Sequence, residues 1–136
     1  MKGRLITVVP IVVLLAAALF LTPSSDVLAA STTCNSCADC SSKLASGSWD
    51  TVTLTTDISN HAGTCIGLIL GESNVVFDCD GHTIDGDDTA IDPDHGITMM
   101  HGTGNTIRNC TVSDFSDGIY LWDATNHVIT NNTLTS

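Results

Sequence analysis

The sequence predicts an all-β fold, a right-handed single-stranded parallel β-helix of three to four coils that follows a short N-terminal cap. Two observations predict it. Segments rich in Thr, Val and Ile are interrupted by Gly, Asn and Asp, and a repeat of 22 residues runs to the C-terminus. Such segments are typical of short strands and tight turns. Each repeat is long enough for one coil, and successive coils stack about 4.8 Å apart through parallel strand pairing.

Residues 1–29 are expected to form a secretory signal peptide rather than part of the fold. Lys2 and Arg4 make a basic start, residues 5–21 are almost entirely apolar, and Val27 and Ala29 have the spacing that a signal peptidase accepts. An uncleaved membrane anchor is the alternative, because the apolar run is just long enough to span a bilayer. Cleavage predicts a secreted, cell-surface or periplasmic protein without further membrane contact.

Residues 30–47 are expected to form a cysteine-rich N-terminal cap, with a helical turn or two over residues 41–46. The chain has six cysteines, and an even number outside the cytosol predicts disulfides. The run CNSCADC also has a spacing found in metal sites, but an oxidising compartment favours disulfides over zinc or iron–sulfur ligation. The six residues are Cys34, Cys37, Cys40, Cys65, Cys79 and Cys110.

Residues 48–136 are expected to form the β-helix repeats. Residues 96–117 align with residues 118–136 at a constant offset of 22. The matched pairs include Gly96 with Gly118, Ile97 with Ile119, Ile107 with Ile129, Asn109 with Asn131, Thr111 with Thr133, and Val112 with Leu134. Each match predicts two residues that lie one above the other in neighbouring coils.

An earlier coil over residues 65–79 aligns with residues 96–110 at an offset of 31. We therefore place nine extra residues after Cys79 and before Gly96, in a loop that projects from the β-helix. The alignment predicts two interior columns, one of Ile66, Ile97 and Ile119 and one of Val76, Ile107 and Ile129. A further coil is expected at TVTLTTDI, with Leu54 placed 22 residues before Val76.

The same alignment predicts polar and covalent links between coils. Asp78, Asn109 and Asn131 fall in one column, where Asn tolerates the left-handed turn and donates hydrogen bonds to its neighbours. Cys79 and Cys110 also share a column, and a separation of about 4.8 Å lies within the range of a disulfide. Cys65 would then pair with a cysteine of the cap, although a bridge between Cys65 and Cys79 is a rival.

The stretch GTCIGLILGESNVVFDCDGHTIDG, followed by NTIRNCTV and NHVITNNTL, resembles the right-handed β-helix repeat proteins, in particular the NosD-like and pectate-lyase-like superfamily. The resemblance covers residues 48–136 and implies the fold rather than one function, because this fold serves lyases, hydrolases, epimerases, adhesins and surface proteins. Repeat folds need caps at their ends, so we expect the chain to be an N-terminal fragment of a longer protein.

The acidic stretch DGDDTAIDPD is the best candidate for a ligand site, and calcium is the expected ion. Calcium prefers carboxylate oxygens, although the spacing is neither that of an EF-hand nor that of calcium-binding β-rolls. A bare charged loop without an ion is the favoured interpretation, and calcium binding is the alternative to it. The candidate ligands are Asp85, Asp87, Asp88, Asp92 and Asp94.

No catalytic residue is assigned. The resemblance to polygalacturonases would imply NTD, GHG and RIK motifs and an adjacent Asp pair, but only the pair Asp87-Asp88 is present, and His82 lies in GHT. Pectate lyases use an Arg or Lys as the base, for which only Lys43 and Arg108 remain after the signal peptide, and Arg108 is expected to face outward.

The NosD resemblance implies a possible link to copper handling. Methionine and histidine suit copper, and the segment MMH at residues 99–101 with His95 provides both. Met99 alternates with Ile97, however, and is expected in the core. A core strand followed by a turn is therefore the preferred interpretation of this segment.

The formal net charge of −11 argues against nucleic acid as a partner, because phosphates need clustered Lys and Arg. The first hypothesis for function is a non-catalytic module that presents a flat parallel sheet to an extracellular polysaccharide or a surface protein. The alternatives are the N-terminal part of a polysaccharide-active lyase or glycoside hydrolase, and a NosD-like periplasmic protein that handles copper.

Overall fold

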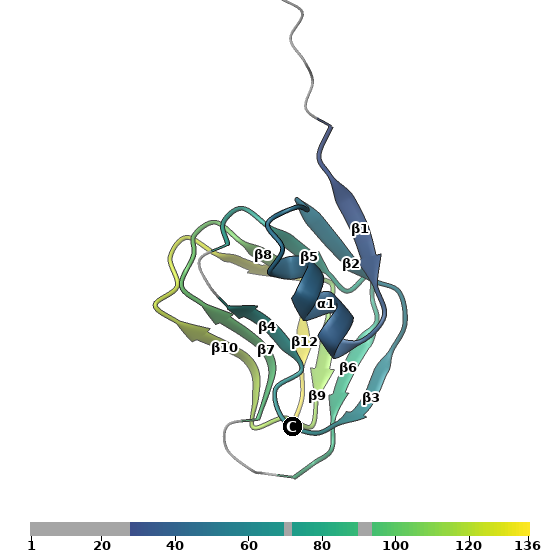
Figure 1. Cartoon of the computed structure of the whole chain (residues 1–136). Helices are drawn as coiled ribbons and strands as arrows, with labels where there is room; N and C mark the ends of the chain where they lie inside the picture. The colour runs from purple at the N-terminus through teal and green to yellow at the C-terminus, as the bar shows by residue number, and fades with distance from the viewer. Residues whose placement is uncertain (1–27, 70–71, 90–93) are drawn as a thin grey trace, which may run out of the picture.

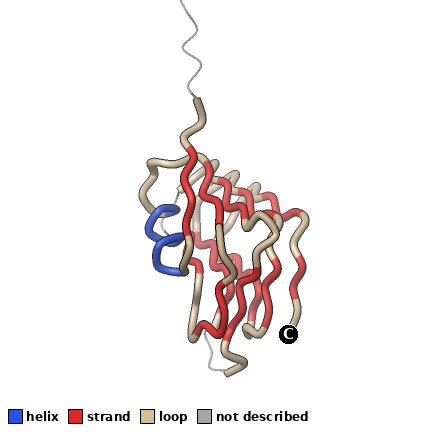
Figure 2. Tube along the Cα trace, turned by 90° about the vertical axis from the view of Figure 1, so that its right-hand side faces the viewer, coloured by secondary structure: helices blue, strands red, loops and turns tan. Residues whose placement is uncertain are grey.

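The structure, a computed structural model, describes residues 28–69, 72–89 and 94–136. The predicted signal peptide lies almost wholly outside the described residues. Within them the chain forms one helix and twelve strands, and the strands are stacked as the rungs of a parallel β-helix (Figures 1 and 2). The predicted fold class is confirmed.

Three parallel sheets form the sides of the β-helix. The first sheet contains, in spatial order, β1 (Ser31–Cys34), β2 (Thr51–Leu54), β5 (Val76–Asp78), β8 (Thr106–Arg108) and β11 (Val128–Thr130). The second contains β3 (Ile58–His61), β6 (Thr83–Gly86), β9 (Thr111–Ser113) and β12 (Thr133–Leu134). The third contains β4 (Ile66–Ile69), β7 (His95–Met100) and β10 (Asp117–Trp122).

The core consists of apolar side chains that point inward from each sheet and stack from coil to coil. Every second residue of a strand faces one side, so a strand of three or four residues contributes one or two core side chains. The core residues that have no exposed surface include Val52, Leu54, Ile66, Phe77, Ile84, Ile97, Met99, Ile107 and Val112.

The register of the later coils agrees with the 22-residue repeat. Ile119 pairs with Ile97, Ile129 with Ile107, and Leu134 with Val112. The pairing of Ile66 with Ile97 at an offset of 31 is present as well. The spacing of the repeat therefore reports the stacking of the coils directly.

The predicted interior column of Val76 and Ile107 is wrong by one residue. Phe77 pairs with Ile107, whereas Val76 pairs with Thr106 and is partly exposed. This register buries the larger aromatic side chain, and the burial of apolar area drives folding. The alignment of Leu54 with Val76 is wrong for the same reason, because Val52 is the partner of Phe77.

The nine extra residues are also spread more widely than predicted. Counted between paired positions, the connection from β4 to β5 is one residue longer than that from β7 to β8. The connection from β5 to β6 is two residues longer than that from β8 to β9, and the one from β6 to β7 is six residues longer than that from β9 to β10. The acidic loop therefore holds six of the nine.

The N-terminal cap is a strand and a helix rather than a helical turn alone. β1 extends the first sheet beyond β2, and α1 (Cys37–Leu44) lies across the end of the β-helix (Figure 1). Ser36 caps the helix, since its hydroxyl accepts a hydrogen bond from the backbone N–H of Asp39 at 3.3 Å. Leu44 is 1% exposed, so the helix covers apolar side chains of the first coil.

Three disulfides join the cap and the coils. Cys79 bridges to Cys110 in the neighbouring coil, which is the stacked pairing rather than the rival with Cys65. Cys65 instead bridges to Cys37 of α1. The remaining bridge joins Cys34 to Cys40 and closes a loop within the cap.

Of the column predicted for Asp78, Asn109 and Asn131, the hydrogen bond between Asp78 and Asn109 is present, and Arg108 adds a second bond to Asp78. Asn109 and Asn131 adopt left-handed backbone conformations with φ of 57° and 55°. Asn109 Nδ2 donates to Asp78 Oδ1 at 2.9 Å, and Arg108 Nε donates to Asp78 Oδ2 at 2.7 Å. At the corresponding turn of the earlier coil the left-handed residues are Asp80, at φ 49°, and Gly81, at φ 86°, rather than Asp78.

The stacked disulfide is expected to stabilise the fold by closing a loop of about 30 residues. Replacement of both cysteines, Cys79→Ser with Cys110→Ser, should lower the free energy of unfolding by about 3–4 kcal/mol. Urea denaturation of the purified variant and of the oxidised wild type measures the difference. A loss below about 0.5 kcal/mol would show that the coils stay in register without this bridge.

Acid is expected to weaken the network around Asp78. Burial raises the pKa of Asp78. Hydrogen bonds from Asn109, from the Asp80 backbone and from Arg108 lower this pKa by a larger amount, so the net shift is downward. A lowered pKa in the folded state contributes stability that is complete above the unfolded value of about 3.9 and is lost as the pH falls through the folded value.

The variant Asp78→Asn tests this dependence. Its free energy of unfolding should lie about 1–2 kcal/mol below wild type at pH 6. The gap should narrow towards pH 2, because protonation removes the same charge from the wild type. Asp80→Asn, at an exposed neighbouring position, is the control. An equal gap at both pH values would contradict the assigned role of the charge.

Candidate functional site

The acidic stretch forms a corner of the β-helix at the end of β6, and its first members are engaged within the protein. Asp85 accepts hydrogen bonds from the Ser113 hydroxyl at 2.7 Å and from the Asn60 N–H at 3.3 Å, and these contacts lower its pKa. Asp87 accepts from the hydroxyl and N–H of Thr89, which likewise lower the pKa of Asp87. Both carboxylates are therefore held as anions.

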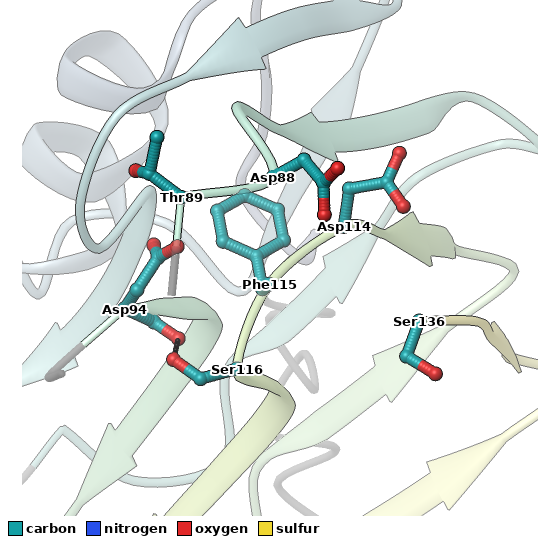
Figure 3. A pocket seen from close by; sticks show the side chains of 7 residues that line it. All are labelled: Asp88, Thr89, Asp94, Asp114, Phe115, Ser116 and Ser136. Atoms are coloured by element: carbon teal, nitrogen blue, oxygen red, sulfur yellow. Dashed lines mark hydrogen bonds between the residues drawn. The ribbon is translucent and has the colours of Figure 1, made fainter. Parts of the chain in front are cut away.

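A cavity of about 100 Å³ opens beside this corner (Figure 3). Its lining residues are Asp88, Thr89, Asp94, Asp114, Phe115, Ser116 and Ser136. Burial, a hydrogen bond with Asp85 and the neighbouring charges of Asp85 and Asp88 raise the pKa of Asp114 above its ordinary value.

The sequence-predicted calcium ligands are only partly brought together. Asp85 and Asp88 lie near Asp114, a residue from the next coil that the spacing of the acidic stretch could not reveal. Asp94 is 2% exposed, and its Oδ1 atom has no hydrogen-bond partner among the described residues. In Figure 3 the ring of Phe115 lies between Asp94 and the other two acids of the cavity. Asp92 lies outside the described residues, and the calcium site stays a prediction.

A second place of interest is the outer face of the sheet formed by β4, β7 and β10. The rings of His95 and Tyr120 stack with centroids 4.4 Å apart and planes 4° apart. His95 Nδ1 also lies 3.1 Å from Asp117 Oδ2, but without the orientation of a hydrogen bond, so this contact is an ion pair only when the imidazole is protonated. The stack fixes the orientation of the Tyr120 ring.

Trp122 extends this aromatic surface. Tyr120 and Trp122 are two residues apart on β10, and strand alternation puts them on the side opposite Leu121, whose partner Met99 is in the core. Trp122 is 55% exposed, an unusual exposure for the largest apolar side chain. Thr98, which pairs with Tyr120, is 4% exposed.

The residues considered for copper do not form one site. Met99 is completely buried, as predicted. His101 Nδ1 lies 3.1 Å from Asp123 Oδ2 on the next coil, and His95 is held in its stack with Tyr120. None of these side chains belongs to a group of three close His, Cys, Asp or Glu ligands within the described part of the chain.

One such group does occur among the described residues, and it comprises Cys37, His61 and Cys65. Their candidate ligand atoms all lie within 4.8 Å of one another. Cys37 opens α1, His61 ends β3, and Cys65 directly precedes β4. The two sulfurs form a disulfide, so they offer thiolates to a metal only when that bond is reduced. Sequence reasoning placed Cys37 in a metal-like spacing but had no partner for His61.

The two strong bases considered for lyase chemistry are engaged in ion pairs. Arg108 is bound to Asp78, and its side chain is 44% exposed on the outer face, as predicted. Lys43 Nζ donates to the Thr33 carbonyl at 2.6 Å and to Asp39 at 2.9 Å. Among the described residues, neither base forms an ion pair with a carboxylate of the acidic corner.

Among the described residues, no helix is long and apolar enough to cross a membrane.

Comparison with known proteins places this architecture in a family. The model of a family described as "Periplasmic copper-binding protein (NosD)" matches residues 19–136, which is more than four fifths of the chain. No curated protein and no solved structure matches significantly. Since the family match covers all the described coils and the fold is a parallel β-helix, the chain belongs to the NosD family.

Proposed function

We propose that this chain is an extracytoplasmic β-helix module that binds a neutral polysaccharide on the outer face of β4, β7 and β10. The observation that carries the proposal is the pair of outward aromatic side chains on β10, Tyr120 and Trp122. Aromatic rings combine an apolar face with a polar edge, which suits the apolar faces and hydroxyl groups of sugar rings.

The geometry supports an extended ligand. Alternate residues of a strand are about 7 Å apart, so both rings can contact one chain laid along β10. Stacking on His95 already fixes Tyr120, which reduces the entropy lost on binding. The polar side chains Asp117 and Asp123 flank the aromatic pair, are 53% and 74% exposed, and can accept hydrogen bonds from sugar hydroxyls.

The charge of the chain favours a neutral ligand over an acidic one. A net charge of −11 repels uronic-acid and sulfated chains. The same charge argues against the alternative in which these coils bind the substrate of a lyase acting on acidic polysaccharides.

Replacement of the exposed tryptophan tests the proposal. In affinity electrophoresis through gels that contain neutral glucans, mannans or xylans, the wild type should be retarded by at least one polymer. Trp122→Ala should weaken that retardation by about tenfold or more, as expected for an aromatic anchor. Val128→Ala, at another half-exposed apolar position on β11, is the matched control. Failure of the wild type to bind any polymer, or equal retardation of Trp122→Ala, would sink the proposal.

Copper binding is a second candidate function, supported by the description of the matching family and by the presence of two sulfurs and an imidazole in one group. Thiolate and imidazole are ligands that copper prefers, whereas the buried Met99 is not accessible.

Equilibrium dialysis measures this second candidate directly. The purified chain is dialysed against Cu(II) in air and against Cu(I) under anaerobic, reducing conditions. Stoichiometric retention of copper in either state is the expected result. If the chain retains neither Cu(II) in air nor Cu(I) under reducing conditions, this second candidate function is wrong.

A further inference from the structure

We propose that Cys37, His61 and Cys65 form a redox-gated Cu(I) site, which is closed while the two cysteines are joined and opens when a dithiol reductant cleaves their disulfide. This inference rests on the second candidate function and names its site. The structure brings three ligands from three different elements to one point, with their donor atoms within 4.8 Å of one another.

The Cys37–Cys65 disulfide differs from the other two. Its cysteines are 7% and 4% exposed, whereas no cysteine of the other bridges exceeds 2%. Among the described residues, its two sulfurs are also the disulfide sulfurs that form a group of close candidate ligands with a histidine ring nitrogen. His61 is partly exposed, so the group has a side that faces solvent. A reductant and a metal ion can therefore approach this bridge more readily than the others.

The surroundings favour an anionic sulfur once the bridge is open. Cys37 is the first residue of α1, and the helix dipole stabilises negative charge at a helix N-terminus. His61 also lies near a carboxylate. The pKa of Asp87 is lowered chiefly by hydrogen bonds from Thr89 and also by the charge of His61. A carboxylate close to a metal-binding histidine helps to orient its ring.

The cap has anchors that do not depend on this disulfide. Ser41 Oγ donates to the Cys65 carbonyl at 3.3 Å and accepts from the Gly67 N–H at 3.0 Å, so α1 is bound to the start of β4 by hydrogen bonds. Leu44, the last residue of α1, is buried against the core, and the Cys65 N–H donates to the His95 carbonyl at 3.0 Å. The three ligands therefore stay close after reduction.

The chemistry balances in two steps. The dithiol gives two electrons and two protons to the disulfide and becomes a disulfide itself, which leaves two thiols on Cys37 and Cys65. Cu(I) then binds the two thiolates and the His61 imidazole, and two protons are released. Copper does not change its oxidation state, because the conditions that open the bridge also keep copper as Cu(I). Soft thiolates select Cu(I) over harder ions.

The test measures Cu(I) affinity of the full chain by competition with a chromophoric Cu(I) chelator under anaerobic conditions. Oxidised and dithiol-reduced protein are compared after the reductant has been removed. Reduced wild type should bind one equivalent of Cu(I), and the oxidised form should bind none at this site. X-ray absorption of the copper complex should report two sulfur ligands and one nitrogen ligand.

Two variants and their controls isolate the site. His61→Ala leaves every disulfide in place and should weaken Cu(I) binding by about tenfold or more. His82→Ala is its control, since His82 is a partly exposed histidine that directly precedes β6 and is paired with Asp57. Cys37→Ser with Cys65→Ser should abolish binding, whereas Cys79→Ser with Cys110→Ser removes a different bridge and should preserve it.

The outcomes separate the site from the function on which it rests. If the double variant, Cys37→Ser with Cys65→Ser, binds Cu(I) as tightly as the wild type, the proposed site is wrong and copper binds elsewhere on the chain. No copper bound in either redox state overturns both. Binding of Zn(II) without Cu(I) overturns the metal assignment, and loss of the β-sheet circular dichroism signal on reduction overturns the gate, since the ligands would then disperse.

Discussion

In-register stacking of inward apolar side chains is the constraint on which the rest of the structure depends. A strand of three or four residues cannot bury its own apolar side chain, so each coil is stable only on its neighbour. The columns that contain Phe77 and Ile107, and Ile97 and Ile119, show how each sheet satisfies this requirement. Residues in excess of the regular repeat have no place in a column, so they lie in the connections between strands.

Covalent and ionic links complement this packing between coils. Apolar columns resist separation of the coils, but a column of similar side chains specifies register weakly, because a slip can exchange one apolar neighbour for another. The Cys79–Cys110 bridge and the contacts of Asp78 with Arg108 and Asn109 join particular residues of adjacent coils. They discriminate the native register, and they do so in a chain whose net charge of −11 opposes compaction.

The candidate sites lie where the regular repeat ends or is interrupted. The acidic corner follows β6, where the connection to β7 is six residues longer than the one from β9 to β10. The Cys37–His61–Cys65 group lies where the cap meets the first full coil. The aromatic pair on β10 is different, because it uses the outer positions of a regular strand. In each place the stacked coils provide a rigid frame, which holds side chains in fixed positions at little cost in entropy.

The sequence by itself determined the fold class and the later register, because equal coils convert a constant spacing along the chain into contact. It favoured the stacked pair of Cys79 and Cys110 for the same reason, and the structure excluded the rival bridge between Cys65 and Cys79. It misplaced Val76 because the constant offset of 31 between residues 65–79 and 96–110 hides a local shift, since Phe77 pairs with Ile107 at an offset of 30. Only the tertiary structure decided that His61 lies beside Cys37 and Cys65, and that Asp114 joins the acidic corner. The first contact joins the cap to residues at two different sheets, and the second joins coils of unequal length. No repeat length therefore relates the residues that meet. Their proximity depends on the path of the loops and on how the cap docks.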